Sequence, residues 1–172
     1  MKLTFRDRLR LAWELTWPLA LIDLGVVVLI HGAFDVKSEI PDTLWALIAF
    51  FGVGPWVVRR ALARRYADWR IVPVTGKIQS AHLNYQQSLK VMWLLAWRTI
   101  PVALLALLAV SALFRATGAS LPQSASLDDP MVNQLGLSMI DTISSLALYP
   151  LLIPGMLKKR YKGFHLEVRS LS

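Results

Sequence analysis

The 172-residue chain contains no cysteine, and its three histidines are far apart in the sequence. Without cysteine there is no disulfide, no thiol nucleophile and no thiolate ligand for a metal. No Ser/His/Asp grouping, His-x-x-x-His pair or acidic cluster stands at a spacing that would build an active site or a metal site. We therefore expect no enzyme, no metal and no cofactor. A lipid-modifying enzyme is only a distant alternative.

Acidic residues are also scarce, since 11 Asp and Glu stand against 19 Lys and Arg, for a net charge of +8. Such basicity can indicate nucleic-acid binding, but the chain has no nucleic-acid-binding motif. Sixteen of the 19 basic residues lie within residues 1–10, 59–90 and 158–172, whereas the other two loops carry mostly acids. Membrane proteins keep their basic loops on the cytoplasmic side. The pattern predicts both termini and the central segment in the cytoplasm, and no nucleic-acid partner.

Apolar residues dominate, at 55% of the chain with a mean hydropathy of +0.48. Four apolar segments, at about 11–31, 40–58, 89–114 and 132–157, approach the roughly 20 residues that a helix needs to cross a bilayer. Acidic residues interrupt the first segment and no clean cleavage site follows, which favours a retained signal-anchor over a cleaved signal peptide. We expect an all-α integral membrane protein, a four-helix transmembrane bundle forming one membrane domain over residues 1–172. Its expected location is the bacterial inner membrane.

The chain also resembles itself. Five residues in or just before the first apolar segment recur 80 positions later, and four residues from the end of the second segment onward recur 95 positions later. One insertion in the loop 118–130 accounts for the difference. We therefore expect two repeated hairpins related by a parallel pseudo-two-fold axis: repeat one over 1–75, a cytoplasmic linker over 59–88 that forms a short strand or a surface-lying helix, and repeat two over 89–172. The recurring residues are Leu9, Trp13, Leu15, Trp17 and Leu24, then Pro55, Leu62, Arg65 and Tyr66.

Four ionisable residues of the apolar segments qualify as charges within the membrane: Glu14, Asp23, Arg98 and Asp141. A charge at the centre of a membrane helix costs about 2.5–3.5 kcal/mol, so such residues are candidates for ion pairs or proton sites. Arg98 has two possible pairings, with Glu14 across the pseudo-two-fold axis or with Asp23 and Asp141 near the midplane. One base against three acids leaves carboxylates that are protonated, face water or pair with another subunit.

Other residues of the apolar segments are polar or aromatic at regular spacing. Gln134, Ser138 and Ser145 share one face of the last segment with Asp141, a polar stripe that serves either helix packing or a solute path. Four tryptophans near the cytoplasmic ends of the first and third segments are expected to anchor the chain at the interface. They are Trp13, Trp17, Trp93 and Trp97.

The function expected from these features is that of a non-enzymatic subunit or scaffold of a membrane assembly, which self-associates or docks on a membrane-protein partner. The alternative is a small oligomeric proton- or ion-coupled transporter or channel that uses the intramembrane acids. The basic cytoplasmic segments are expected to attract anionic lipid, at about 1 kcal/mol per Lys or Arg near the surface.

Overall fold

The computed structural model of the chain describes residues 3–34, 38, 40–66, 68–76, 78–80, 82–117 and 130–171. It contains four helices that are long and apolar enough to cross a membrane, as expected of an all-α multi-pass membrane protein: Phe5–Ala33, Ile40–Ala63, Tyr85–Ala106 and Gln134–Lys158. The first is α1 (Phe5–Val27) continued by the π-helix η1 (Val28–Ala33), and the second joins α2 (Ile40–Ile48), η2 (Ala49–Val53) and α3 (Gly54–Ala63). The third and fourth belong to α4 (Tyr85–Thr117) and α5 (Pro130–Lys158).

Local sequence explains where these helices begin and change pitch. Thr4 caps α1 in a capping box, because its hydroxyl accepts from the Asp7 amide while the Asp7 carboxylate accepts from the Thr4 amide. The second helix widens to a π-helix over η2, immediately before Gly54 and Pro55 at the start of α3. Proline has no N–H and blocks the regular hydrogen bond to the preceding turn, which makes such an irregularity the expected result.

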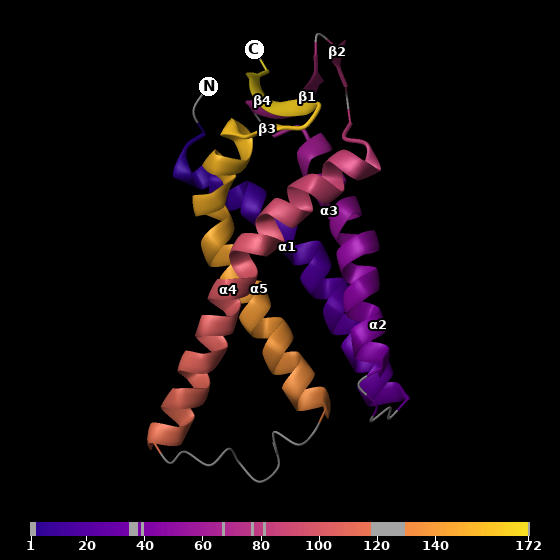
Figure 1. Cartoon of the computed structure of the whole chain (residues 1–172), viewed down its shortest axis with the longest axis vertical. Coiled ribbons are helices and arrows are strands. Elements are labelled where there is room, and N and C mark those ends of the chain that lie inside the picture. Colours follow the sequence, from indigo (N-terminus) through magenta and orange to yellow (C-terminus); the bar gives the residue numbers. More distant parts are fainter. Residues whose placement is uncertain are drawn as a thin grey trace.

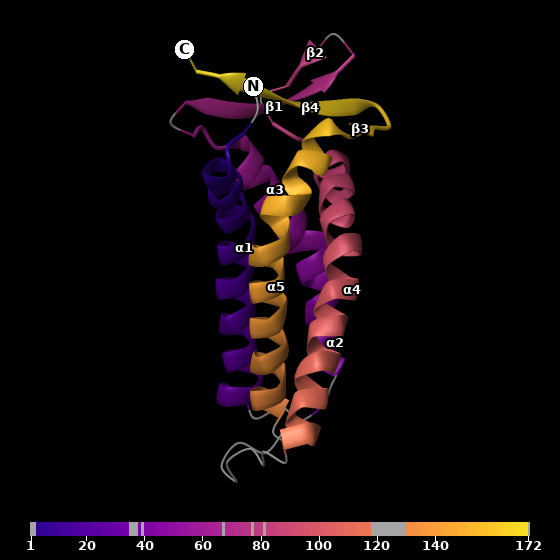
Figure 2. The same ribbon diagram turned by 90° about the vertical axis from the view of Figure 1, so that its left-hand side faces the viewer.

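A small sheet accompanies the helices, which corrects the all-α expectation. Its four strands are β1 (Trp69–Thr75), β2 (Ile78–Gln79), β3 (Arg160–Tyr161) and β4 (Phe164–Ser170), in the antiparallel order β2-β1-β4-β3. The sheet lies across one end of the helices, where both chain termini are also found (Figures 1 and 2). A short strand was one of the two structures expected in the linker 59–88, which contains β1 and β2. The C-terminal strands and the sheet as a whole were not expected, because short strands give a weak signal beside long apolar runs.

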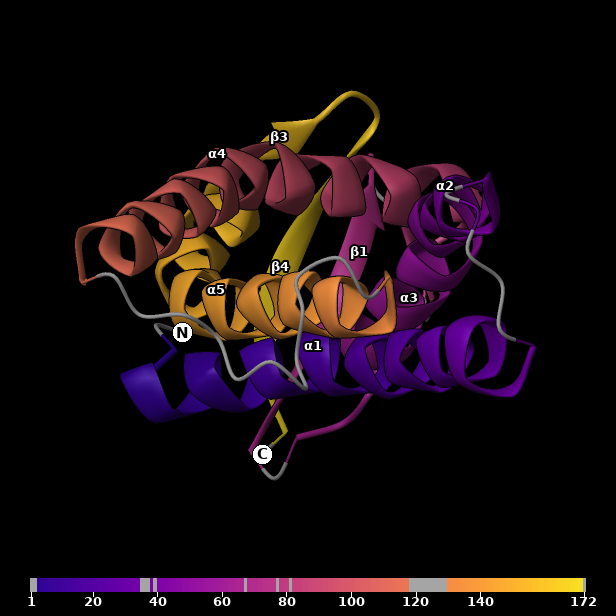
Figure 3. The same ribbon diagram turned by 90° about the horizontal axis from the view of Figure 1, so that it is seen from below.

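The core lies at the sheet end of the molecule. Leu11 on α1, Val91 on α4 and Ile153 on α5 are fully buried and belong to the same cluster as Trp69 and Leu166 of the sheet. Viewed from the far end, α5 lies between α1 and α4 (Figure 3), and Figure 2 shows the same order from the side. Away from the sheet, α4 and α5 diverge (Figure 1) and expose apolar side chains that a bilayer would cover.

Two expectations remain predictions. The termini and the sheet share one end of the bundle (Figure 1), and the cytoplasmic location of this end stays a prediction. The expected insertion in the loop between the third and fourth membrane helices falls on residues 118–129, which lie outside the described residues.

Candidate functional site

A polar cavity of about 300 Å³ lies between α1, the second membrane helix and α5. Two carboxylates line it, Asp23 from α1 and Asp141 from α5. Its wall contains no Lys or Arg among the described residues. The remaining polar wall consists of hydroxyl and amide side chains, namely Thr16, Gln134, Ser138, Thr142, Ser145 and Tyr149.

The carboxylate of Asp23 is held by donors from two neighbouring helices. The Trp45 indole Nε1 donates to Asp23 Oδ1 at 2.6 Å, and the Ser138 hydroxyl donates to Oδ2. Both donors are neutral, so they orient the carboxylate without balancing its charge. Asp23 therefore joins α1 to α2 and to α5, and neither of its two donors brings a cation to the cavity wall.

Asp141 stands one turn along α5 from Ser138 and faces the same cavity. The Asp141 residue is exposed, and it shares the cavity wall with Asp23. No described residue forms an ion pair with it. The cavity thus gathers two acids that have no cation of their own.

The cavity includes most of the polar residues that the sequence singled out in the apolar segments. Gln134, Ser138 and Ser145 line it together with Asp141. Asp23 lines it from α1, although it lies 115 positions before Ser138 in the sequence. The donor Trp45 was missed, because nothing in the sequence relates position 45 to position 23 before the helices are packed.

Arg98 forms neither of the two expected pairings with a described residue. It is exposed, and its guanidinium lies over Gly155 of α5, where Nη1 is 3.3 Å from the place a Cβ would occupy. Its charge also acts on Tyr161. Burial raises the pKa of Tyr161 to about 12, and the nearby charge of Arg98 opposes this rise. Long cationic side chains bend toward the membrane surface in this manner. The guanidinium therefore lies nearer the sheet than its Cα does.

Glu14 finds its cation elsewhere. Arg64, directly after α3, donates from Nη1 to Glu14 Oε1. The Glu14 side chain is 11% exposed and that of Arg64 50%, so a buried acid meets a base that reaches in from the surface. The other oxygen, Oε2, is buried and has no hydrogen-bond partner in the described part of the chain. Glu14 therefore belongs to the sheet end and not to the cavity.

The four tryptophans lie on the halves of α1 and α4 nearer the sheet. Trp13, Trp93 and Trp97 are more than half exposed, and the Arg60 guanidinium lies 5.0 Å from the ring centroid of Trp17. Large exposed indoles at this level suit the headgroup region. Their anchoring role stays a prediction.

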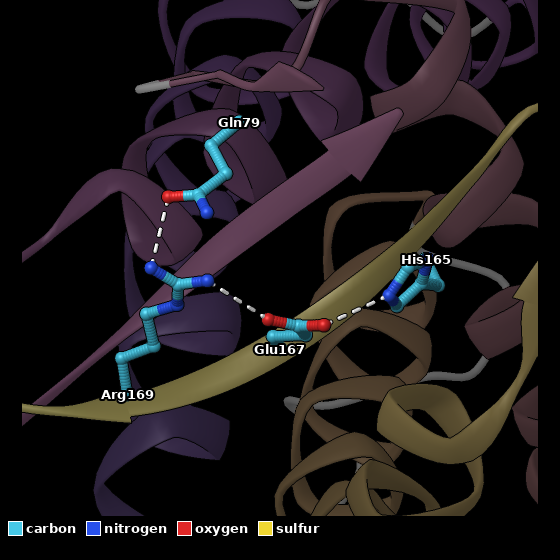
Figure 4. A network of polar contacts seen from close by, with 4 residues as sticks. All are labelled: Gln79, His165, Glu167 and Arg169. Atoms are coloured by element: carbon cyan, nitrogen blue, oxygen red, sulfur yellow. Dashed lines mark hydrogen bonds and ion pairs between the residues drawn. The ribbon is translucent and has the colours of Figure 1, made fainter. Parts of the chain in front are cut away.

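A separate polar network covers the outer face of the sheet (Figure 4). His165 Nε2 lies 3.0 Å from Glu167 Oε1, and Arg169 donates to Glu167 Oε2 at 3.2 Å and to Gln79 Oε1 at 2.9 Å. The hydrogen bond with His165, followed by that from Arg169, lowers the pKa of Glu167 below its ordinary value. The network ties β4 to β2 and offers no reactive group.

At the opposite end of the molecule, buried His31 on η1 lies 2.9 Å from Asp42 on α2. No group of three or more possible metal ligands occurs in the part of the chain that the structure describes. Comparisons with known proteins add no name to these sites, because no family model, curated protein or solved structure matches the chain.

Proposed function

We propose that this protein binds a proton or a small cation in the polar cavity and acts as a small ion-coupled transporter or channel. The observation that carries the proposal is the presence of Asp23 and Asp141 in one cavity between membrane-spanning helices, with no Lys or Arg among the described residues of its wall. Intramembrane carboxylates of this kind mark ion pathways and proton relays.

Charge balance supports a bound proton or cation. An uncompensated charge at the centre of a membrane helix costs about 2.5–3.5 kcal/mol, and two carboxylates that line one cavity would repel each other if both were ionised. A proton on one of them, or a cation between them, removes most of that cost. Carboxylate, hydroxyl and amide oxygens are also the ligands that hard cations prefer. Ser138, Thr142 and Ser145 continue these ligands along α5.

The same proposal includes the orientation of the molecule. The basic segments 1–10, 59–90 and 158–172 flank the sheet end of the helices. We place this end in the cytoplasm and the helices in a bacterial inner membrane, because basic loops are retained on the inner side.

Matching contacts support the proposal that the chain consists of two copies of one unit. The Tyr66 and Trp69 rings stack at 4.0 Å, and 95 positions later Tyr161 and Phe164 stack at 4.7 Å. Each tyrosine hydroxyl donates to the carbonyl five residues before it. In the β1–β4 pairing, Val72 lies opposite Glu167, again 95 positions apart. This register supports a two-fold axis between the two strands.

A second candidate function is that of a subunit or scaffold in a membrane assembly. Away from the sheet, α4 diverges from the other helices (Figure 1) and exposes Ile100, Leu104, Leu105 and Leu108 by 56% or more. Another membrane protein or a second copy of the chain would fit this face, although lipid tails cover such a surface equally well. The size of the purified particle tests this candidate.

Proton flux into proteoliposomes tests the first candidate. Vesicles loaded with a pH-sensitive dye and driven by a potassium diffusion potential should acidify with the wild-type protein, and Asp23→Asn or Asp141→Asn should reduce the rate at least about tenfold. Asp68→Asn, which removes an acid outside the cavity, is the matched control and should leave the rate unchanged. Sodium flux in the same vesicles distinguishes a proton from a cation. If neither flux exceeds that of empty vesicles, the transport proposal is wrong.

A further inference from the structure

A second cavity, of about 470 Å³, lies at the sheet end between η2, the first turns of α4 and β3. Its wall combines four cations with aromatic side chains. This second cavity is separate from the polar cavity that contains Asp23 and Asp141. The cations are Lys90, Lys159, Arg160 and Lys162.

None of these four cations forms an ion pair with a described residue, and no acid lines the cavity. Lys90 Nζ donates to the Lys162 carbonyl at 3.2 Å, and the Lys159 ammonium lies 5.8 Å from the Tyr161 ring centroid. Arg98 adds its charge beside the same ring. Cations held together without a counter-ion raise the local positive potential and attract an anion.

In the first half of the chain, the cation equivalent to Lys159 is balanced by an acid of the protein itself. The position 95 residues before Lys159 is Arg64, which pairs with Glu14. The position 80 residues after Glu14 is Leu94, which has no charge. The second half therefore keeps the cation and has no acid at the position equivalent to Glu14, which leaves this charge open to an anion from outside the chain.

The aromatic side of the cavity indicates an amphiphile. The rings of Phe50 and Trp93 meet edge to face at 5.8 Å, and the Tyr85 hydroxyl donates to the Phe51 carbonyl at 2.7 Å, which fixes this part of η2 against α4. Trp93 is 58% and Phe51 50% exposed. A cationic wall next to an exposed aromatic wall, where a membrane helix meets the sheet, has the chemistry and depth of a phospholipid headgroup.

We propose that this cavity binds an anionic phospholipid, with the phosphate among Lys90, Lys159 and Arg160 and the start of an acyl chain against Trp93 and Phe50. A soluble anion would use only the cations and leave the aromatic wall open to water. The proposal does not depend on ion transport and goes beyond the general attraction of basic loops to anionic membranes.

Native mass spectrometry of the full chain in neutral detergent tests this site. Added phosphatidylglycerol should bind more tightly than phosphatidylcholine. Lys90→Gln, Lys159→Gln and Arg160→Gln combined should weaken phosphatidylglycerol binding at least about tenfold. The matched control removes three exposed charges elsewhere, Arg6→Gln, Arg10→Gln and Arg59→Gln, and should change binding less than about twofold. Equal losses in the two variants would reduce the site to general surface attraction and overturn the proposal.

Two further measurements separate the lipid from a free phosphate and do not depend on the triple variant folding. Inorganic phosphate at millimolar concentration should not displace the lipid; complete displacement would identify a soluble-anion site instead. In nanodiscs, phosphatidylglycerol with brominated acyl chains should quench tryptophan fluorescence more than brominated phosphatidylcholine does. This excess should disappear in Trp93→Phe. Equal quenching by both lipids in the wild-type protein would also overturn the proposal.

Discussion

At the scale of single residues, the contact between Glu14 and Arg64 joins a buried carboxylate to a base that reaches in from the surface. A charge left alone in a buried place is costly, whereas a neutral group of the same shape is not. This asymmetry makes the pair testable by removing its members one at a time.

Arg64→Gln should lower the free energy of unfolding by about 1–3 kcal/mol, a value reduced from that of fully buried pairs because Arg64 is half exposed. Adding Glu14→Gln to the same chain should restore part of the loss. Unfolding in detergent, followed by the helical circular dichroism signal, measures both changes. Arg59→Gln, which changes an exposed base without an acidic partner among the described residues, is the control. An unchanged stability in Arg64→Gln would contradict the pair.

Glu167 allows a prediction of pH dependence at the same scale. Its pKa lies below the ordinary value of 4.5 in the folded protein, chiefly through the hydrogen bond with His165 and then through Arg169. A carboxylate with a lowered folded pKa adds stability above its unfolded pKa, and this stability is lost as the pH falls through the folded value. Carbon-13 NMR of the Glu167 carboxyl should therefore give a midpoint below 4.5. His165→Ala should move that midpoint upward, and Glu167→Gln should remove the resonance. A wild-type midpoint at or above the ordinary value would refute the network.

At the scale of elements, the junction of each helix with its strand depends on a tyrosine. Tyr66 and Tyr161 are buried, stack on the next aromatic ring, and donate their hydroxyls to the last turns of α3 and α5. Tyr66→Phe and Tyr161→Phe should each lower stability by about 1 kcal/mol, because each removes one buried hydrogen bond. Thermal unfolding in detergent compares them with Tyr85→Phe, which removes an exposed hydrogen bond to the Phe51 carbonyl instead of a buried one and should cost less. Losses that differ severalfold between the two variants would argue against equivalent junctions.

The β1–β4 register can be tested because the chain has no cysteine of its own. Arg70 lies directly opposite Arg169. Cysteines at these two positions should form a disulfide under mild oxidation, since directly opposite residues have suitable spacing. Cysteines at Val72 and Arg169, shifted by two residues, should react much more slowly. Mass spectrometry of the digested protein detects the cross-link, and equal rates for both pairs would disprove the register.

The elements also show how far sequence reasoning extends. Hydropathy was sufficient to predict four membrane helices, and the spacing of Gln134, Ser138, Asp141 and Ser145 was sufficient to predict a shared polar face. Hydropathy did not predict the sheet, whose strands are short. The partners of Asp23 and Glu14 come from other helices, and residue spacing within one helix carries no information about them. For Arg98, helix depth located the Cα, but the long side chain moves its charge elsewhere.

At the scale of the whole molecule, both termini lie at one end, so they are predicted on the same side of the membrane, and the basic segments predict that this side is the cytoplasm. Fusions to green fluorescent protein at either terminus should fluoresce, and alkaline phosphatase inserted after Gly76 should be inactive, because all three sites are expected in the cytoplasm. Phosphatase inserted within 118–129 should be active. Fluorescence at only one terminus would overturn both the topology and the duplication.

Val72 opposite Glu167 has a consequence for how such a molecule acquires two different sites. In a homodimer of a single hairpin, this central position would face its own copy, and a glutamate there would meet a glutamate. Once the two units share a chain, as we propose, each position is free to differ from its counterpart. Asp141 corresponds to Ala46 and Asp23 to Ala103, just as Leu94 corresponds to Glu14. Covalent fusion, as we propose it, lets equivalent positions diverge, so that residues from both halves build one cavity with carboxylates and another with cations.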